Sequence, residues 1–211
     1  MSAGDLVVDI GAGSGMLTAP LLAAGARVRA LEPDRRLAAR LRRACPAAEV
    51  FSVDALRYRW PDEPFRVVAN LPFAHAADIC RTLLGDPRLP LRSADLVVEW
   101  DFAAKRARLW PSTALTVVWS AWYELAVVRR IEPAAFAPVP SVAAGVLRAR
   151  RRTRPLVHSA DAAGYEAFVR VGFRDPRARE RDPHAWALRW RQESSGRART
   201  VTRMTRRGRG R

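Results

Sequence analysis

Four adjacent residues, Asn70-Leu71-Pro72-Phe73, are of types that could activate an amine. The exocyclic amine of adenine is a poor nucleophile because its lone pair is delocalised into the ring. The side-chain oxygen of Asn70 and the backbone carbonyl of Leu71 could accept both amine hydrogens, so that the nitrogen becomes pyramidal and attacks a methyl donor. Pro72 would stiffen the turn, and Phe73 offers a flat face for an extruded base. A lone tetrapeptide of this kind is more often a turn that ends a strand. The neighbouring sequence features therefore decide between a turn and a catalytic site.

A glycine-rich loop earlier in the chain is the first of these surroundings. The apolar run at residues 6–10 predicts a strand, and it leads into Gly11-Ala12-Gly13-Ser14-Gly15 and then into a segment with helical spacing. Gly11, Gly13 and Gly15 would allow a tight turn and a close approach of a ligand to the backbone at a helix amino-terminus. Met16 stands where the dinucleotide fingerprint has its third glycine, which disfavours a nicotinamide enzyme.

Two acids follow the next two predicted strands. Glu32 ends a strand at residues 27–31, at the spacing from the glycine loop at which an acid meets a ribose. The alternative is a solvated acid, or the cap of the next helix, for which Asp34 is better suited. Asp54 ends the following strand and could accept a hydrogen bond from the amine of an adenine, although alone it would be taken for a turn residue. With the tetrapeptide, these features predict a site for S-adenosylmethionine.

The same elements define the expected fold. Four short strands, at residues 6–10, 27–31, 50–53 and 65–69, alternate with helical or loop segments, and the tetrapeptide follows the fourth of them. This pattern is typical of βαβ units, so we expect an α/β fold with a doubly wound, Rossmann-like methyltransferase sheet. Ligands of such sheets bind at the carboxyl ends of the strands, where the tetrapeptide lies. We expect three parts: a catalytic domain at 1–153, a small helical RNA-binding domain at 154–193, and an Arg-rich, disordered tail at 194–211.

The charge distribution points to a nucleic-acid substrate. The formal net charge is +16, and almost all of the excess lies after residue 100. A nearly neutral half joined to a basic half suggests a small-molecule site beside a polyanion-binding surface. We expect the Arg-rich end to raise RNA affinity through phosphate contacts while contributing little to base choice.

Location, cysteines and assembly follow from simpler features of the sequence. The chain lacks both an apolar stretch long enough for a membrane span and the pattern of a signal peptide. We therefore expect a cytoplasmic protein with free thiols at Cys45 and Cys80, no metal site and no membrane partner. The sequence says little about assembly, and a monomer is the working expectation.

Several segments, in order, resemble the ribosomal RNA adenine dimethyltransferases, and more closely their erythromycin-resistance branch. They are VVDIGAGSGMLT, ALEPD, SVDAL, NLPF, LVVEWDFAAKRAR, FAPVPSV and YEAFVRVGF, between about residue 5 and residue 174. The resemblance implies methylation of an adenine in 23S ribosomal RNA, once or twice, and resistance to macrolides, lincosamides and streptogramin B. It implies donor binding by Gly11, Glu32, Asp54 and Asn70, with Asn70 and Phe73 framing the adenine and Phe136 flanking it.

Two departures from the family pattern bear on these expectations. Asp9 stands where the family's first acidic residue, a donor-binding position, is usually Glu. Family members also carry a Gln-Asn-Phe segment before the glycine loop that closes over the donor, whereas this chain starts close to Gly11. The sequence therefore predicts either a start placed too late or a donor site with an open lid.

Other functions stay open. The first is the housekeeping branch that dimethylates small-subunit ribosomal RNA, although that branch usually ends the tetrapeptide with Tyr where this chain has Phe73. DNA adenine and protein glutamine methyltransferases share the same amide chemistry. The FAPVPSV segment and the basic tail favour RNA over protein substrates, and equal activity on unpaired DNA would count against an RNA enzyme. A truncated, non-catalytic RNA-binding homologue would keep the basic surface, and in that case Asn70→Ala would change nothing measurable.

Overall fold

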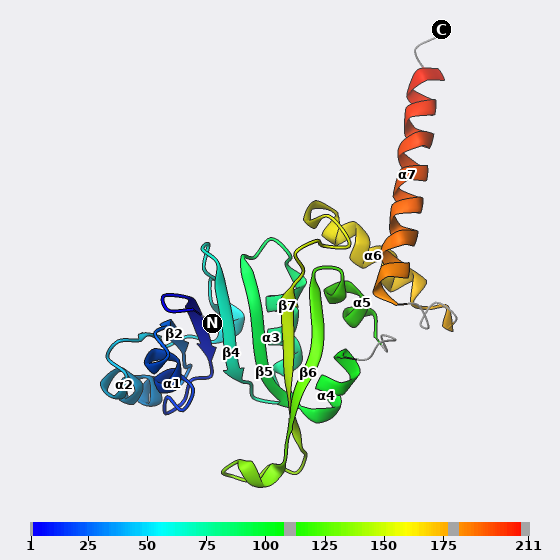
Figure 1. The fold of residues 1–211 in the computed structure, drawn as a ribbon. Coiled ribbons are helices and arrows are strands. Elements are labelled where there is room, and N and C mark those ends of the chain that lie inside the picture. Colours follow the sequence, from blue (N-terminus) through cyan, green and yellow to red (C-terminus); the bar gives the residue numbers. More distant parts are fainter. Residues whose placement is uncertain (1, 108–112, 177–181, 208–211) are drawn as a thin grey trace.

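The computed structural model describes residues 2–107, 113–176 and 182–207, with side chains described up to residue 195. Within these ranges lies a seven-stranded sheet with the order β3-β2-β1-β4-β5-β7-β6 (Figure 1). Five of the strands pair in parallel: β1 (Leu6–Ile10), β2 (Arg27–Leu31), β3 (Glu49–Phe51), β4 (Phe65–Asn70) and β5 (Leu91–Glu99). The order reverses between β1 and β4, which confirms the predicted doubly wound, Rossmann-like arrangement.

The parallel strands form because they are short apolar runs that can be buried on both faces. All five residues of β1 are buried, and β4 alternates between buried and half-buried positions before it ends at the exposed Asn70. The predicted bounds of β1 and β2 match the structure. The third strand is shorter than predicted, because Asp54 accepts a hydrogen bond from the Leu56 backbone and starts the turn η1 (Ala55–Arg57).

The remaining two strands run antiparallel to their neighbours. β7 (Ala144–Arg151) pairs with β5, and β6 (Tyr123–Ile131) pairs with β7 at the edge of the sheet. Between them, η2 (Pro133–Ala135) and the proline-rich segment after it form a loop that extends beyond the end of the sheet (Figure 1).

Helices cover the sheet unevenly. The two amino-terminal helices, α1 (Thr18–Ala23) and α2 (Arg35–Ala44), pack on the β1–β3 end of the sheet. Three others cover one face of the β4–β6 half: α3 (Ala76–Gly85), α4 (Trp100–Arg106) and α5 (Ala114–Ser120) (Figure 1). The opposite face of that half is turned toward the viewer in Figure 1, and no described helix lies over it.

The carboxyl-terminal helices are joined to the rest by aromatic side chains. α6 (Ala162–Gly172) follows the turn η3 (Ser159–Asp161), and its Tyr165 ring makes an edge contact with Trp122, 6.0 Å between centroids. α7 (Pro183–Arg207) packs on α6 through Trp186 and Trp190, which contact the Phe168 ring.

The helix α7 continues to Arg207, into the segment for which we expect a disordered tail, and that expectation stays a prediction (Figure 1). Asp182 caps the helix by accepting from the Ala185 backbone. Trp186 and Trp190 pack its first turns, which supply the nucleus that the helix needs. Residues 208–211 lie outside the described residues, and the division of the chain at 153 and 193 stays a prediction.

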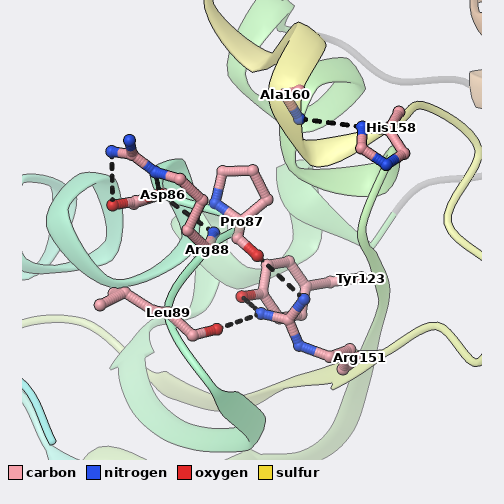
Figure 2. A network of polar contacts seen from close by, with 8 residues as sticks. All are labelled: Asp86, Pro87, Arg88, Leu89, Tyr123, Arg151, His158 and Ala160. Atoms are coloured by element: carbon pink, nitrogen blue, oxygen red, sulfur yellow. Dashed lines mark hydrogen bonds and ion pairs between the residues drawn. The ribbon is translucent and has the colours of Figure 1, made fainter. Parts of the chain in front are cut away.

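Arg151, on β7, ties the loop between α3 and β5 to the antiparallel strands (Figure 2). Its guanidinium donates to the backbone carbonyls of Pro87, Leu89 and Leu91 and to the Tyr123 hydroxyl. Three of these bonds from one half-buried cation go to carbonyls at or just before the start of β5, so Arg151 fixes the end from which β5 starts.

Candidate active site

A pocket of about 390 Å³ lies at the carboxyl ends of β1 and β4. It brings together the glycine loop, the end of the Asn70 strand and the segment after η2. Its lining residues are Asp9, Gly11, Ala12, Gly13, Ser14, Met16, Leu17, Asn70, Val97, Ile131, Ala135, Phe136 and Ala137. Five predicted site residues, Asp9, Gly11, Gly13, Asn70 and Phe136, therefore share one pocket although they come from distant parts of the chain.

The glycine loop has a conformation that requires glycine. Gly11 and Gly13 have φ angles of +69° and +55°, in the left-handed region that other residues rarely adopt. The Gly11 and Ala12 amides donate to the Leu31 carbonyl at the end of β2, at 2.8 and 3.0 Å. A Cβ added to Gly11 would lie 3.8 Å from the Asn70 carbonyl oxygen, so the loop lies directly against the tetrapeptide.

Gly15 has a different environment. Its φ is +93°, and an added Cβ would come within 2.7 Å of Leu41 on α2 and 3.3 Å of Cys45. Gly15 thus lets α2 pack against the loop, and it is not among the residues that line the pocket. Its predicted contact with the cofactor stays a prediction, whereas its packing role was not visible in the sequence.

The tetrapeptide is held by its neighbours at fixed points. The Leu71 amide donates to the Val97 carbonyl on β5 at 3.0 Å, and the Leu71 side chain is buried. The His75 amide donates to the Pro72 carbonyl at 2.9 Å and closes the turn before α3. Neither the side-chain oxygen of Asn70 nor the Leu71 carbonyl oxygen accepts a hydrogen bond from any described residue. Both acceptors are therefore free for a ligand, and the Leu71 backbone is anchored by its own amide. Phe73, half-buried, follows in the same turn outside the pocket lining.

Asp9 is a buried acid in the wall of the pocket. Only 1% of its surface is exposed, and its Oδ2 accepts from the Thr18 hydroxyl at 2.7 Å. Its Oδ1 has no hydrogen-bond partner among the described residues. Burial raises the pKa of Asp9 from 3.8 to about 6; the Thr18 hydrogen bond opposes this rise, and the nearby Glu32 carboxylate adds to it.

The other two predicted acids lie at the same sheet edge, outside the pocket lining. Glu32 is buried, and its two oxygens accept from the Gly13 amide at 2.8 Å and from the Asp34 amide at 2.9 Å. Asp34 itself caps α2, as its position suggests. Asp54 is exposed and caps η1. Glu32 therefore fixes the loop conformation, and the predicted contacts of both acids with a nucleoside stay predictions.

Sequence reasoning did not identify several lining residues. Ile131 and Val97 form the apolar side of the pocket, and Met16 is 83% exposed beside it. Val97 and Ile131 line the pocket because strand pairing brings β6 near β5. A single sequence does not reveal this pairing. Thr18 carried a usable signal, because a hydroxyl at the start of a helix after a glycine loop lies close to the preceding strand.

Metal-binding clusters and membrane-spanning helices are both absent from the described residues. The described residues contain no group of three or more His, Cys, Asp or Glu side chains that could hold a metal ion. Among the described helices, none is both long and apolar enough to cross a bilayer. Cys45 and Cys80 are buried free thiols.

The reversal of strand order at β1 and β4, the glycine loop and the pocket beside Asn70 define a Rossmann-like methyltransferase fold. The crystal structure of the 23S rRNA methyltransferase ErmE matches it with a TM-score of 0.73 and 31% identity, over 82% of this chain and 72% of ErmE. The family model described as "Ribosomal RNA adenine dimethylase" matches residues 1–178. The chain belongs to this family.

Two curated relatives represent both branches of interest. The mycinamicin-resistance protein MyrB of Micromonospora griseorubida is 37% identical over 171 residues, which is 81% of this chain and 54% of MyrB. Ribosomal RNA small subunit methyltransferase A of Opitutus terrae is 35% identical over 189 residues, 82% of this chain and 66% of that protein. The chain thus spans between about half and two thirds of the length of these relatives.

Proposed function

We propose that this chain transfers methyl groups from S-adenosylmethionine to the exocyclic amine of an adenine in 23S ribosomal RNA, and so confers resistance to macrolides, lincosamides and streptogramin B. One observation carries the proposal: the glycine loop, Asn70 and Phe136 line a single pocket. The similarity to MyrB, a resistance protein, and to ErmE, a 23S rRNA methyltransferase, supports the choice of substrate.

The free acceptors of the tetrapeptide suit this chemistry. An adenine amine has two hydrogens, and the Asn70 side-chain oxygen and the Leu71 carbonyl offer one acceptor to each. Both hydrogen bonds draw the lone pair out of conjugation with the ring. The anchor from the Leu71 amide to Val97 holds the Leu71 carbonyl in place, so this acceptor needs little reorganisation when the base arrives. Phe73 and Phe136 supply faces for a base outside its helix.

The residues present fit S-adenosylmethionine, which supplies an electrophilic methyl group when bound. Asp9 offers the unpaired carboxylate oxygen in the pocket wall, and the ammonium group of the donor is a suitable partner for it. Gly11 and Gly13 leave the loop without side chains that would exclude the donor. Glu32 would take the ribose and Asp54 the adenine of the donor, since both end strands at the same sheet edge.

A specific observation keeps the small-subunit branch as a second candidate. The Opitutus terrae enzyme is nearly as similar to this chain as MyrB is, at 35% against 37% identity. The two candidates share the reaction and differ only in the RNA that carries the target adenine. Phe73 in place of the Tyr usual in that branch favours the large subunit.

The test measures methyl transfer from labelled S-adenosylmethionine to protein-free 23S and 16S ribosomal RNA. We expect transfer to one adenine of 23S rRNA, and a loss of at least about a hundredfold in Asn70→Ala, because one of the two acceptors is gone. His75→Ala is the matched control: it removes an exposed side chain from the same turn outside the pocket, and it should keep its activity.

Each other outcome has a defined meaning. Transfer to 16S rRNA alone would assign the chain to the small-subunit branch. Equal transfer to unpaired DNA would contradict an RNA-specific enzyme. RNA binding without any methyl transfer, together with the same RNA affinity in Asn70→Ala, would indicate a non-catalytic RNA-binding protein.

A further inference from the structure

The edge strand β6 contains a bulge close to the pocket. Val127 pairs with Leu147 of β7, but the next pair in the register is Arg129 with Val146. Val128 is therefore the extra residue, and 49% of its surface is exposed. A bulge of this kind changes the direction in which the following side chains point, and bulges occur often beside functional sites.

The register places Arg129 on the uncovered face of the sheet. Val146 pairs with Val97 of β5, and Val97 pairs with Asn70 of β4, and directly paired residues share a face. Arg129 thus belongs to the same cross-strand row as two pocket-lining residues, Val97 and Asn70. Ile131, two residues further on β6 and so on the same face, also lines the pocket.

The other arginines near Arg129 already have partners. On the same face, Arg148 pairs with Asp95 at 2.6 Å and Arg150 pairs with Glu124 at 2.7 Å. On the opposite face, Arg130 lies over the Trp100 ring at 5.0 Å and pairs with Glu132 at 3.0 Å.

Arg129 differs from all three. It is exposed, and no described residue forms an ion pair or a hydrogen bond with its side chain. Without the bulge, the paired position next to the pocket would hold Val128. The bulge therefore places an unpaired cation on an open surface, two strands away from Val97, or about 10 Å at normal strand spacing.

We propose that Arg129 binds the RNA phosphate next to the adenine that enters the pocket. This inference rests on the proposed function, because it requires a nucleotide at Asn70. An extruded base remains attached to its backbone, so the adjacent phosphates must lie at the rim of the pocket. The uncovered face of β6 and β7 continues that rim, and a guanidinium suits a phosphate because it can donate two parallel hydrogen bonds.

The experiment compares Arg129→Gln with Arg150→Gln. Both substitutions remove one guanidinium from the same sheet face, but Arg150 is paired with Glu124 and lies two rows further from the pocket. Methyl transfer gives kcat and the KM values for RNA and for donor. A titration of the same protein-free RNA, followed by fluorescence anisotropy at several salt concentrations, gives binding without turnover.

For Arg129→Gln we expect about a tenfold rise in KM for RNA, with kcat and the donor KM changed by less than about twofold. The slope of log affinity against log salt should fall by about 0.7, the value for one phosphate on a single strand. Arg129→Lys should recover part of the affinity and the full slope, because it keeps the charge. Arg150→Gln should change RNA affinity by less than about twofold.

Two results would overturn the inference. One is an unchanged salt slope in Arg129→Gln, and the other is equal losses in the Arg129 and Arg150 variants, which would indicate only a general effect of positive charge. If the unaltered protein transfers no methyl group, the proposed function fails, and the titration still decides whether Arg129 contacts a phosphate.

Discussion

Replacing the buried Asp9 with Asn should change how the stability of the fold depends on pH. The carboxyl group has a pKa of about 6 in the folded chain against an ordinary value of 3.8, mainly because it is buried. A raised pKa means that the folded protein binds this proton more tightly than the unfolded chain does. Asp9 therefore has no destabilising effect well below pH 4, and its destabilising effect grows between about pH 4 and pH 6 and is complete above about pH 7.

The size of this effect follows from the pKa rise. A change from 3.8 to about 6 corresponds to about 3 kcal/mol of unfolding free energy in total, of which about 2.5 kcal/mol develops between pH 4 and pH 8. Solvent screening reduces it little, since Asp9 is 1% exposed. Asn has nearly the same shape and no charge, so the unfolding free energy of the variant does not fall with rising pH for this reason. Any fixed cost from its buried amide group is the same at every pH and cancels in the comparison.

Urea unfolding of the protein and of Asp9→Asn, measured at pH values from 4 to 8, tests this reasoning. We expect the variant to gain about 2.5 kcal/mol relative to the unaltered protein across this range. Thr18→Val removes the hydrogen bond that favours the ionised carboxylate, so it should make the pH dependence steeper. A difference in unfolding free energy between the protein and Asp9→Asn that stays constant with pH would refute a buried carboxyl group with a raised pKa at Asp9.

Ligand binding gives a second readout for the same residue. If the ammonium of S-adenosylmethionine pairs with Asp9, the affinity for the donor should rise from pH 5 to pH 7 as the carboxyl ionises. In Asp9→Asn the affinity should be lower and nearly independent of pH in that interval. Isothermal titration at each pH measures both.

Two further predictions concern packing and need only unfolding measurements in urea. Gly172→Ala places a Cβ within 2.8 Å of the Trp186 ring and should destabilise the fold by about 1–3 kcal/mol, whereas Gly85→Ala has nothing within 4 Å and should be neutral or slightly stabilising. Arg151→Ala leaves three backbone carbonyls of residues 87–91 without their donor and should cost about 1–3 kcal/mol, whereas Arg150→Ala, with 70% of its side chain exposed, should cost less than about 1 kcal/mol. Equal effects within either pair would contradict the packing that we describe.

The parallel half of the fold could be predicted because its signals are local. Each strand is a short apolar run, and a glycine, an acid and an amide (Gly11, Glu32 and Asn70) mark the carboxyl ends of β1, β2 and β4. Once the strands are parallel, their carboxyl ends share one edge, so Gly11 and Asn70 had to lie close together. The structure agrees, with a Cβ on Gly11 only 3.8 Å from the Asn70 carbonyl oxygen.

The antiparallel half contributes features that depend on pairing between distant residues. Phe136 joins the pocket only because β6 returns beside β7 and ends at the same edge as β5. The bulge at Val128 depends on how β6 aligns with β7, and no residue type at 127–129 reveals it. Gly15 likewise packs against residues at and just after α2, whereas its place in a glycine-rich loop of the sequence predicts only a turn.

Glu32 shows how a predicted ligand contact and an observed structural contact can be compatible. Its two oxygens hold the Gly13 and Asp34 amides, which could suggest that nothing remains for a ribose. A carboxylate, however, has about four lone-pair positions, and these two bonds use only one on each oxygen. The observed bonds also fix the carboxylate in a single orientation, so a hydroxyl that approaches the loop would meet acceptors already in place. The conformation of the glycine loop and the binding of the donor would then depend on the same carboxylate. Glu32→Gln should loosen the loop and lower the affinity for the donor.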